Sequence, residues 1–128
     1  MWLERLLNQE RAEEVRQLLD SVASESFYIT DFSFHSIGVI LCRLNKHEVL
    51  TRFVQDIFIY GAVNLIHLEP YNISHVVNII NQFNLDFDDA YQYVAAEKYN
   101  LTIVSFDADF DRCEKSRKTP IEILKEQI

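Results

Sequence analysis

Six aspartates fall within the stretch "LDFDDAYQYVAAEKYNLTIVSFDADFD", residues 85–111. They form two groups, one at the start of an apolar helical pattern and one after an apolar strand pattern: Asp86, Asp88 and Asp89, then Asp107, Asp109 and Asp111. Crowded carboxylates repel one another unless they are fully solvated or share a cation. The spacing therefore indicates either a solvated set of helix caps and turns or a metal site.

Two local metal motifs can be tested directly against the second group. "DADFDRCE" begins like a calcium loop, but Arg112 stands where a tight turn needs glycine and Lys118 where a bidentate glutamate is needed. "TIVSFDAD" resembles the opening of a haloacid dehalogenase-type phosphatase, in which a long catalytic chain follows the aspartates. Only 17 residues follow Asp111 here. Both interpretations fail.

Strand and helix patterns alternate along the rest of the chain. Strands are predicted at 26–30, 62–68 and 101–106, and helices within the first 24 residues, at 31–46, 47–61, 71–84 and 86–100, and in a C-terminal segment whose start carries Thr119, Pro120 and Glu122 as a capping box. This alternation predicts an α/β fold, a three-layer αβα arrangement around a parallel sheet. Sites in such sheets lie beyond the carboxyl ends of the strands, where Asp31, Glu69 and Asp107 stand.

The order of these motifs resembles the C-terminal half of PIN domains, the fold of VapC-type ribonuclease toxins. The matching residues are Asp89-Ala90 at a helix start, Ala95-Ala96 along that helix, and "SFDADF" (105–110) after the strand. The resemblance implies hydrolysis of RNA with Mg²⁺ or Mn²⁺ held by carboxylates. It makes Asp89, Asp107 and Asp109 the catalytic residues, with Asp89 and Asp107 as the chief metal ligands and Asp109 as a further ligand or an orienting residue. Asp31 is a candidate fourth ligand because of its position at the end of a predicted strand.

A basic cluster follows the second acidic group. It consists of Arg112, Lys115, Arg117 and Lys118, which we interpret either as contacts to the phosphates of RNA or as a solvated charged loop. The formal net charge of −8 argues against a simple duplex-binding protein, because such proteins neutralise phosphates with Lys and Arg. A negative net charge is compatible with an enzyme that binds the phosphates of its substrate through divalent cations.

The sequence departs from the family pattern in two places. The first residues, "MWLERLLNQERAEE", read as the helix that follows the family's first strand, so we expect residues 1–128 to be a single PIN-like domain truncated at its N-terminus, without that strand and its aspartate. The glutamate expected in the helix 31–46 is also missing. Its position falls near Ser36, beside His35, which is either a ligand or an ordinary packed residue.

These departures leave three functional hypotheses. The first is a PIN-type ribonuclease, the toxin of a toxin–antitoxin pair, with a small antitoxin protein as its partner. The second is a catalytically degenerate PIN-like binding or scaffold protein, and the third is an acidic α/β domain without a site. A missing central strand would leave backbone groups of its neighbours unpaired, which is costly, so we also predict a homo-oligomer.

Composition sets the remaining limits. The chain of 128 residues is 48% hydrophobic and 25% charged, with only two glycines and two prolines, as expected for one globular domain. Cys42 and Cys113 are too few for a disulfide framework, and we expect free thiols, Cys42 in the core and Cys113 near the surface. No run has membrane-spanning length and no signal peptide is evident, so the expected location is cytoplasmic.

Overall fold

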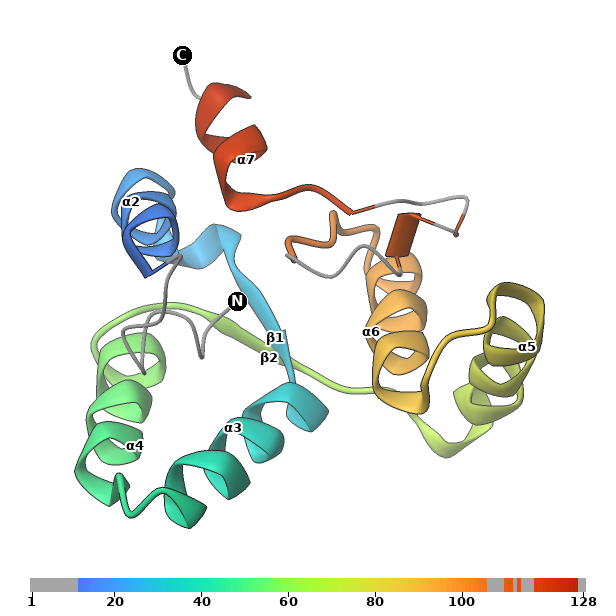
Figure 1. Ribbon diagram of the computed structural model, residues 1–128, viewed down its shortest axis with the longest axis horizontal. Helices are drawn as coiled ribbons and strands as arrows, with labels where there is room; N and C mark the ends of the chain where they lie inside the picture. The colour runs from blue at the N-terminus through green and yellow to red at the C-terminus, as the bar shows by residue number, and fades with distance from the viewer. Residues whose placement is uncertain (1–11, 106–109, 112, 114–116, 127–128) are drawn as a thin grey trace.

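A two-stranded parallel sheet lies at the centre of the computed structural model, with helices around it (Figure 1). The structure describes residues 12–105, 110, 111, 113 and 117–126. Strand β1 (Tyr28–Thr30) pairs with β2 (Asn64–Ile66), and Ile29 stands opposite Leu65. The predicted α/β class with parallel strands is confirmed, although helices dominate the described chain.

The first half of the described chain contains α2 (Ala12–Ser21), the 3₁₀ turn η1 (Ser24–Ser26), α3 (Asp31–Arg43) and α4 (His47–Val54). The helix predicted over 47–61 changes character, because its last part is the π-helix η2 (Gln55–Ile59). Gly61 ends it as expected, since a Cβ there would lie 2.6 Å from the Asp56 carbonyl oxygen.

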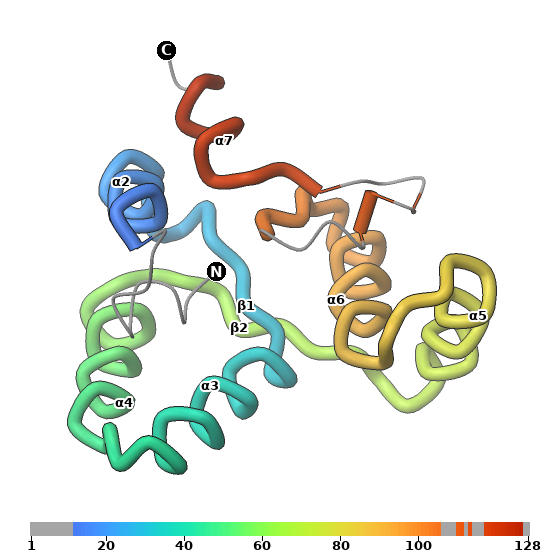
Figure 2. Tube along the Cα trace, in the orientation of Figure 1, coloured from blue at the N-terminus to red at the C-terminus, as the bar shows by residue number. Residues whose placement is uncertain are grey.

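The second half contains the 3₁₀ turn η3 (Pro70–Asn72), α5 (Ile73–Phe83), α6 (Phe87–Lys98) and α7 (Pro120–Glu126). Helices α5 and α6 lie side by side in the Cα trace (Figure 2). Asn84 adopts a left-handed conformation at the end of α5, which turns the chain into α6. The capping box of α7 is confirmed, because Glu122 accepts from the Thr119 N–H at 3.3 Å and donates to the Thr119 hydroxyl at 3.4 Å.

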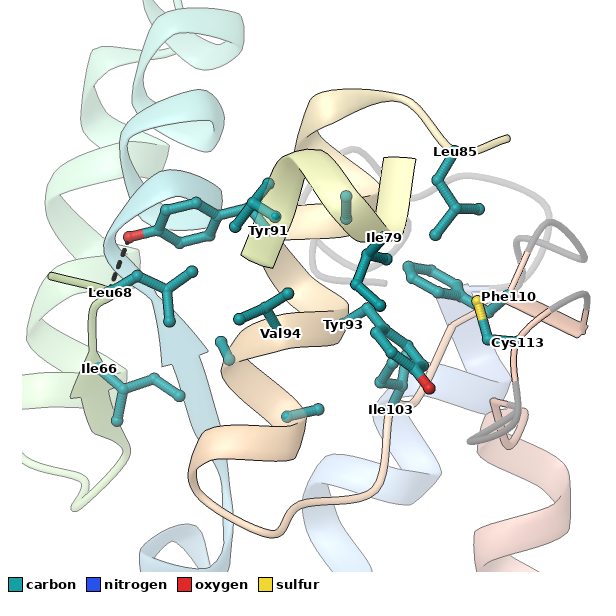
Figure 3. Packing of buried hydrophobic residues seen from close by; sticks show 14 residues of the cluster. Ile66, Leu68, Ile79, Leu85, Tyr91, Tyr93, Val94, Ile103, Phe110 and Cys113 are labelled. Atoms are coloured by element: carbon teal, nitrogen blue, oxygen red, sulfur yellow. Dashed lines mark hydrogen bonds between the residues drawn. The ribbon is translucent and has the colours of Figure 1, made fainter. Parts of the chain in front are cut away.

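The buried side chains form two clusters. The larger one surrounds α6 and is built on buried residues from most of that helix, namely Ala90, Tyr91, Tyr93, Val94, Ala95 and Ala96 (Figure 3). The second lies between β1, α3, α4 and η2 and includes Ile37, Leu41 and Phe53. Helix α6 is therefore held on several sides at once, which makes it a rigid carrier for residues in its first turn.

The strand predicted at 101–106 is not formed over its described residues, 101–105. Val104 makes only an isolated parallel bridge with Lys118. A regular strand needs hydrogen-bonded neighbours over several residues. Among the described residues, this segment has one such neighbour, Lys118, on one of its two edges. Of residues 101–105 only Ile103 is buried, in the core around α6. The sheet of the described residues is thus narrower than predicted.

Both cysteine placements were wrong. Cys42 is exposed and Cys113 is buried, and both are free thiols as expected. The sequence of α3 is apolar almost all round, but the helix buries only the face of Ile37 and Leu41, which leaves Val39 and Cys42 outside. Cys113 packs with Phe110 against the α6 cluster. Among the described residues, no helix combines the length and apolarity needed to cross a membrane.

Candidate functional site

The carboxyl end of β1 is tied to α6 by a buried hydroxyl. Thr30 is 4% exposed, and its hydroxyl accepts from the Ser33 N–H at 3.1 Å, which caps α3. The same hydroxyl donates to the side-chain oxygen of Gln92 at 3.0 Å. One side chain thus caps α3 and fixes α6 against the carboxyl end of β1, the edge of the sheet where the sequence predicts a site. We call this edge the rim.

Asp31 is held at this rim by two donors. The Tyr91 hydroxyl donates to one carboxylate oxygen at 2.7 Å, and the Phe32 N–H donates to the same oxygen at 2.8 Å. The Tyr91 oxygen in turn accepts from the Leu68 N–H, just beyond β2, at 2.9 Å (Figure 3). A hydrogen-bonded chain therefore runs from the end of β2 through α6 to the end of β1.

The environment of Tyr91 favours its neutral form. Burial raises the pKa of the Tyr91 hydroxyl; the Leu68 amide lowers it, and the hydrogen bond and negative charge of Asp31 raise it further. The net shift is upward from 10.0. Tyr91 therefore stays protonated at neutral pH and remains a donor to Asp31.

Asp89 lies in a different environment, in the first turn of α6. Carboxylate oxygens of Asp86, Asp88 and Asp89 all lie within 4.8 Å of one another. Asp86 is the N-cap residue of α6, and one Asp88 oxygen accepts from the Asp89 N–H at 3.0 Å. Asp86 and Asp88 do form a helix start, as predicted. The structure additionally brings their charges together with that of Asp89, which the spacing alone did not indicate.

The two predicted carboxylates face different hollows. Asp89 lines a groove of about 560 Å³ together with Thr30, Ser36 and Gln92. Asp31 lines a smaller pocket of about 450 Å³ with His35 and Tyr91. Ser36, at the position where a glutamate was expected, lies on the wall of both. His35 is exposed. Glu69, which the sequence also places at the end of a strand, has a carboxylate oxygen 2.9 Å from Nε2 of His67.

Four of the predicted site residues lie outside the described residues: Asp107, Asp109, Arg112 and Lys115. Their described neighbours still locate the chain around them. Ser105, two residues before Asp107, lines the same groove as Asp89. Phe110, directly after Asp109, is 3% exposed in the α6 core. The described residues that flank Asp107 and Asp109, Ser105 and Phe110, thus line the Asp89 groove and pack in the α6 core, respectively.

The described members of the basic cluster make internal contacts. Arg117 donates to the Ser105 carbonyl at 3.2 Å and pairs with Asp111 at 3.3 Å, and its side chain is only 17% exposed. Lys118 pairs with Glu126 and bridges to Val104. Arg117 and Lys118 thus connect the C-terminal segment to Val104, Ser105 and Asp111, a role that the charged sequence pattern did not reveal.

The donor set around Asp89 suits a hard divalent cation. Such ions take oxygen ligands, and carboxylates lower the cost of bringing them to the protein. Sequence reasoning missed Tyr91 and Gln92 as parts of the rim. The signal that would have found Gln92 is its spacing of three residues from Asp89, which places both on one face of a helix.

Comparison with protein families gives one result. The sequence model described as PIN domain matches residues 1–116. No curated protein and no solved structure gives a significant match. The matched range contains Asp31, both acidic groups and two of the four residues of the basic cluster, Arg112 and Lys115, and it ends before α7.

Proposed function

Because the chain belongs to the PIN domain family, we propose that it is a divalent-metal-dependent endoribonuclease. The observation that carries this proposal is the group of carboxylates of Asp86, Asp88 and Asp89, which lie within 4.8 Å of one another beside a groove that Asp88 and Asp89 line. A shared cation would remove the mutual repulsion of these charges, which supports metal binding here.

The proposed roles follow the position of each residue. Asp89, Asp107 and Asp109 hold Mg²⁺ or Mn²⁺, with Asp31 as a fourth ligand or an orienting group on the neighbouring pocket. When bound, such an ion lowers the pKa of a bound water and offsets charge on the scissile phosphate. Gln92 keeps α6 fixed to β1 through Thr30, which keeps Asp89 at a constant position relative to the strand end.

Contacts to the RNA are proposed for the basic cluster. Arg112 and Lys115 are the first choice for binding the phosphates beside the scissile bond, because Arg117 and Lys118 already form ion pairs with Asp111 and Glu126. Arg117 and Lys118 contribute by keeping the segment that carries the other two close to the groove. A toxin role with a small antitoxin protein as partner, and assembly as a homo-oligomer, are further parts of this proposal.

A second candidate function is a catalytically degenerate PIN-like binding or scaffold protein. The observation in its favour is Ser36, which stands on the wall of both hollows where the family pattern implies a glutamate. Apart from Asp31, helix α3 has no acidic residue. A hydroxyl is a weaker cation ligand than a carboxylate, so a site built this way could bind an ion without cleaving RNA.

The test combines a Mn²⁺ titration with thermal unfolding and cleavage of a single-stranded RNA. Wild type is compared with Asp107→Asn and with the matched control Asp56→Asn, whose carboxylate is exposed on η2. We expect Mn²⁺ to raise the melting temperature of wild type and control, and only these two to cleave. Stabilisation without cleavage would favour the degenerate binder, and no stabilisation in wild type would refute the metal site.

A further inference from the structure

The pocket that contains Asp31 is formed almost entirely by one face of α3. Its lining follows two rows along this helix, each with a spacing of four residues: Asp31, His35 and Val39, then Phe32, Ser36 and Ile40. Residues four apart are neighbours on a helix surface, so each row runs along one face. Tyr91 of α6, whose side chain points toward α3 (Figure 3), completes the wall. Neither β1 nor residues 101–105 line this pocket.

Three side chains of the pocket carry polar atoms that no described residue engages. Oδ1 of Asp31 accepts from the Tyr91 hydroxyl and the Phe32 N–H, whereas Oδ2 receives no hydrogen bond from the described part of the chain. The His35 ring nitrogens and the Ser36 hydroxyl form none there either. A carboxylate accepts, a hydroxyl can donate, and an imidazole has at least one N–H donor in any protonation state. The pocket thus presents an acceptor beside donors.

The rest of the pocket is apolar. The Phe32 ring packs against the rings of Tyr91 and Phe87, with centroids 5.5 and 5.8 Å away. Val39, which is 49% exposed, and Ile40 follow further along α3. Ligand pockets typically join an apolar wall to a few convergent polar groups. A ligand that fits this one has an apolar body and a polar edge with both a donor and an acceptor.

We propose that this pocket binds an unpaired RNA base whose amino group adjoins an unprotonated ring nitrogen, the edge that adenine and cytosine share. The amino group donates to Oδ2 of Asp31, as amino groups of bases do to carboxylates. The ring nitrogen accepts from the Ser36 hydroxyl or the His35 N–H. Base selection rests on the proposed function, since it names the substrate of that same site. Asp31 then orients the substrate and is not a fourth metal ligand.

The hydrogen bonds of Asp31 decide against the other two bases. Guanine binds a carboxylate through two neighbouring donors, N1–H and N2–H₂, one to each oxygen. Oδ1 of Asp31 is already occupied by Tyr91 and Phe32, so this paired contact is not available. Uracil has a carbonyl oxygen on each side of its N3–H, and these oxygens would meet the negative charge of Asp31. Adenine and cytosine avoid both conflicts.

The position of the pocket also suits a nucleotide. Phe32 and Ser36 line both this pocket and the groove that contains Asp89. A nucleotide whose base fills the pocket therefore has its phosphate on the side of the proposed metal ligands. Single-stranded RNA is commonly recognised through hydrogen bonds to the edges of unstacked bases.

A Lys or Arg side chain of a partner protein is the alternative occupant of the pocket. Its cation would bind Asp31, but Lys and Arg side chains carry donors only. The donors of His35 and Ser36 would then have no acceptor in the ligand, whereas a base supplies one. The combination of donors and an acceptor in the pocket therefore favours a base.

The test uses two pairs of nucleosides that differ at this edge alone, adenosine with inosine and cytidine with uridine. Inosine and uridine carry a carbonyl oxygen in place of the amino group and a protonated ring nitrogen beside it. Binding to the full chain in EDTA is followed by NMR through the amide signals of Ser36 and Val39. We expect adenosine and cytidine to bind at least about fivefold more tightly than their partners. Equal affinity within both pairs, or no shift of these signals, would overturn the proposal.

Asp31→Asn should reverse this preference. The amide oxygen keeps the hydrogen bonds from Tyr91 and Phe32, so the amide NH₂ takes the place of Oδ2 and turns an acceptor into donors. We expect inosine and uridine to bind this variant more tightly than adenosine and cytidine. An unchanged preference would show that Asp31 does not contact the base.

A second pair of variants tests the donors without changing Asp31. Replacing both donors, His35→Ala with Ser36→Ala, should lower the affinity for adenosine about fivefold or more. The matched control is Ser33→Ala, on the same helix but outside the lining of this pocket, and it should leave the affinity unchanged. Wild-type affinity in the double variant would contradict the assigned contacts.

Cleavage of single-stranded RNA with Mn²⁺ separates base selection from ribonuclease activity. Cleavage beside A and C in preference to G and U supports both. Cleavage without base preference would refute base selection alone, and selective nucleoside binding without any cleavage would refute the ribonuclease alone. Acetyl-arginine amide that shifts the Ser36 and Val39 signals at lower concentration than adenosine does would replace the base by a basic side chain.

Discussion

Asp31 is the first residue of α3 and Asp89 lies in the first turn of α6, and the two differ in what surrounds their charge. Asp31 receives hydrogen bonds from the Tyr91 hydroxyl and the Phe32 N–H, so the protein itself compensates its charge. Asp89 lies among two other carboxylates. The comparison separates a carboxylate whose hydrogen bonds tie β1 to α6 from one that lies in a group of three carboxylates, although the sequence presented both as acidic residues of one predicted site.

The largest effect should come from Asp89→Asn. If Asp89 holds the metal, its loss should lower Mn²⁺-dependent RNA cleavage about a hundredfold or more and reduce the Mn²⁺-induced rise in melting temperature. Without metal, the variant should unfold at the same temperature as wild type or higher, because one of three like charges is removed. Thermal scans with and without Mn²⁺, beside cleavage assays, check this. A lower melting temperature in EDTA would show that Asp89 supports the fold instead.

Tyr91→Phe should have the next largest effect, and it should appear as lost stability. The variant leaves the Leu68 N–H and the Asp31 carboxylate without the hydroxyl between them, so we expect a loss of about 2 kcal/mol in the free energy of unfolding. Urea denaturation measures it. Tyr60→Phe, on a tyrosine that is 81% exposed, is the matched control and should change little. Equal values for both variants would mean that the chain through Tyr91 contributes nothing.

Asp31→Asn should be milder, because the amide oxygen can still accept from Tyr91. We expect a loss of less than about 1 kcal/mol in unfolding free energy. If the difference between the two carboxylates holds, this variant keeps most of the stabilisation by Mn²⁺ that Asp89→Asn loses. The same titration decides the point: an equal loss in both variants would make Asp31 a full metal ligand and remove the distinction.

The smallest effect should be a difference in alkaline stability. The pKa of Tyr91 is raised in the folded chain above 10.0, so folding favours the protonated hydroxyl. Its contribution is complete below that pH and is lost as the pH rises through the folded-state pKa. Wild type should therefore lose stability above pH 10 more steeply than Tyr91→Phe, as followed by urea denaturation at a series of pH values. Parallel curves would contradict the raised pKa.

Local chemistry explains which elements could be predicted from the sequence. The capping residue Thr119, the end of the helix at Gly61 and the start of α6 at its aspartates all depend on contacts within about one turn of the chain, and all were predicted correctly. Periodicity located α5 and α6 within two or three residues at each end. These features depend on residues that are close together in the sequence, so the sequence alone is enough to predict them.

Features that depend on distant partners were predicted less well. Cys42 and Cys113 exchanged their expected environments, because burial depends on which helix face packs. The segment 101–106 has a strong strand pattern, yet a strand needs neighbours on its edges, and Val104 finds only Lys118 among the described residues. Arg117 and Lys118 were predicted to bind phosphates, but each forms an ion pair in the folded chain, with Asp111 and Glu126 respectively.

The sequence by itself determined the α/β class, the order of the elements and the family, because periodicity, capping residues and motif spacing are written along one chain. Only the tertiary structure decided which carboxylates meet. The carboxylates of Asp86, Asp88 and Asp89, close in sequence, lie within 4.8 Å of one another, whereas Asp31 is bound by a tyrosine 60 positions away. Electrostatic interactions act over a few ångströms in space, and it is the folding of β1, β2 and α6 against one another that brings these distant residues together.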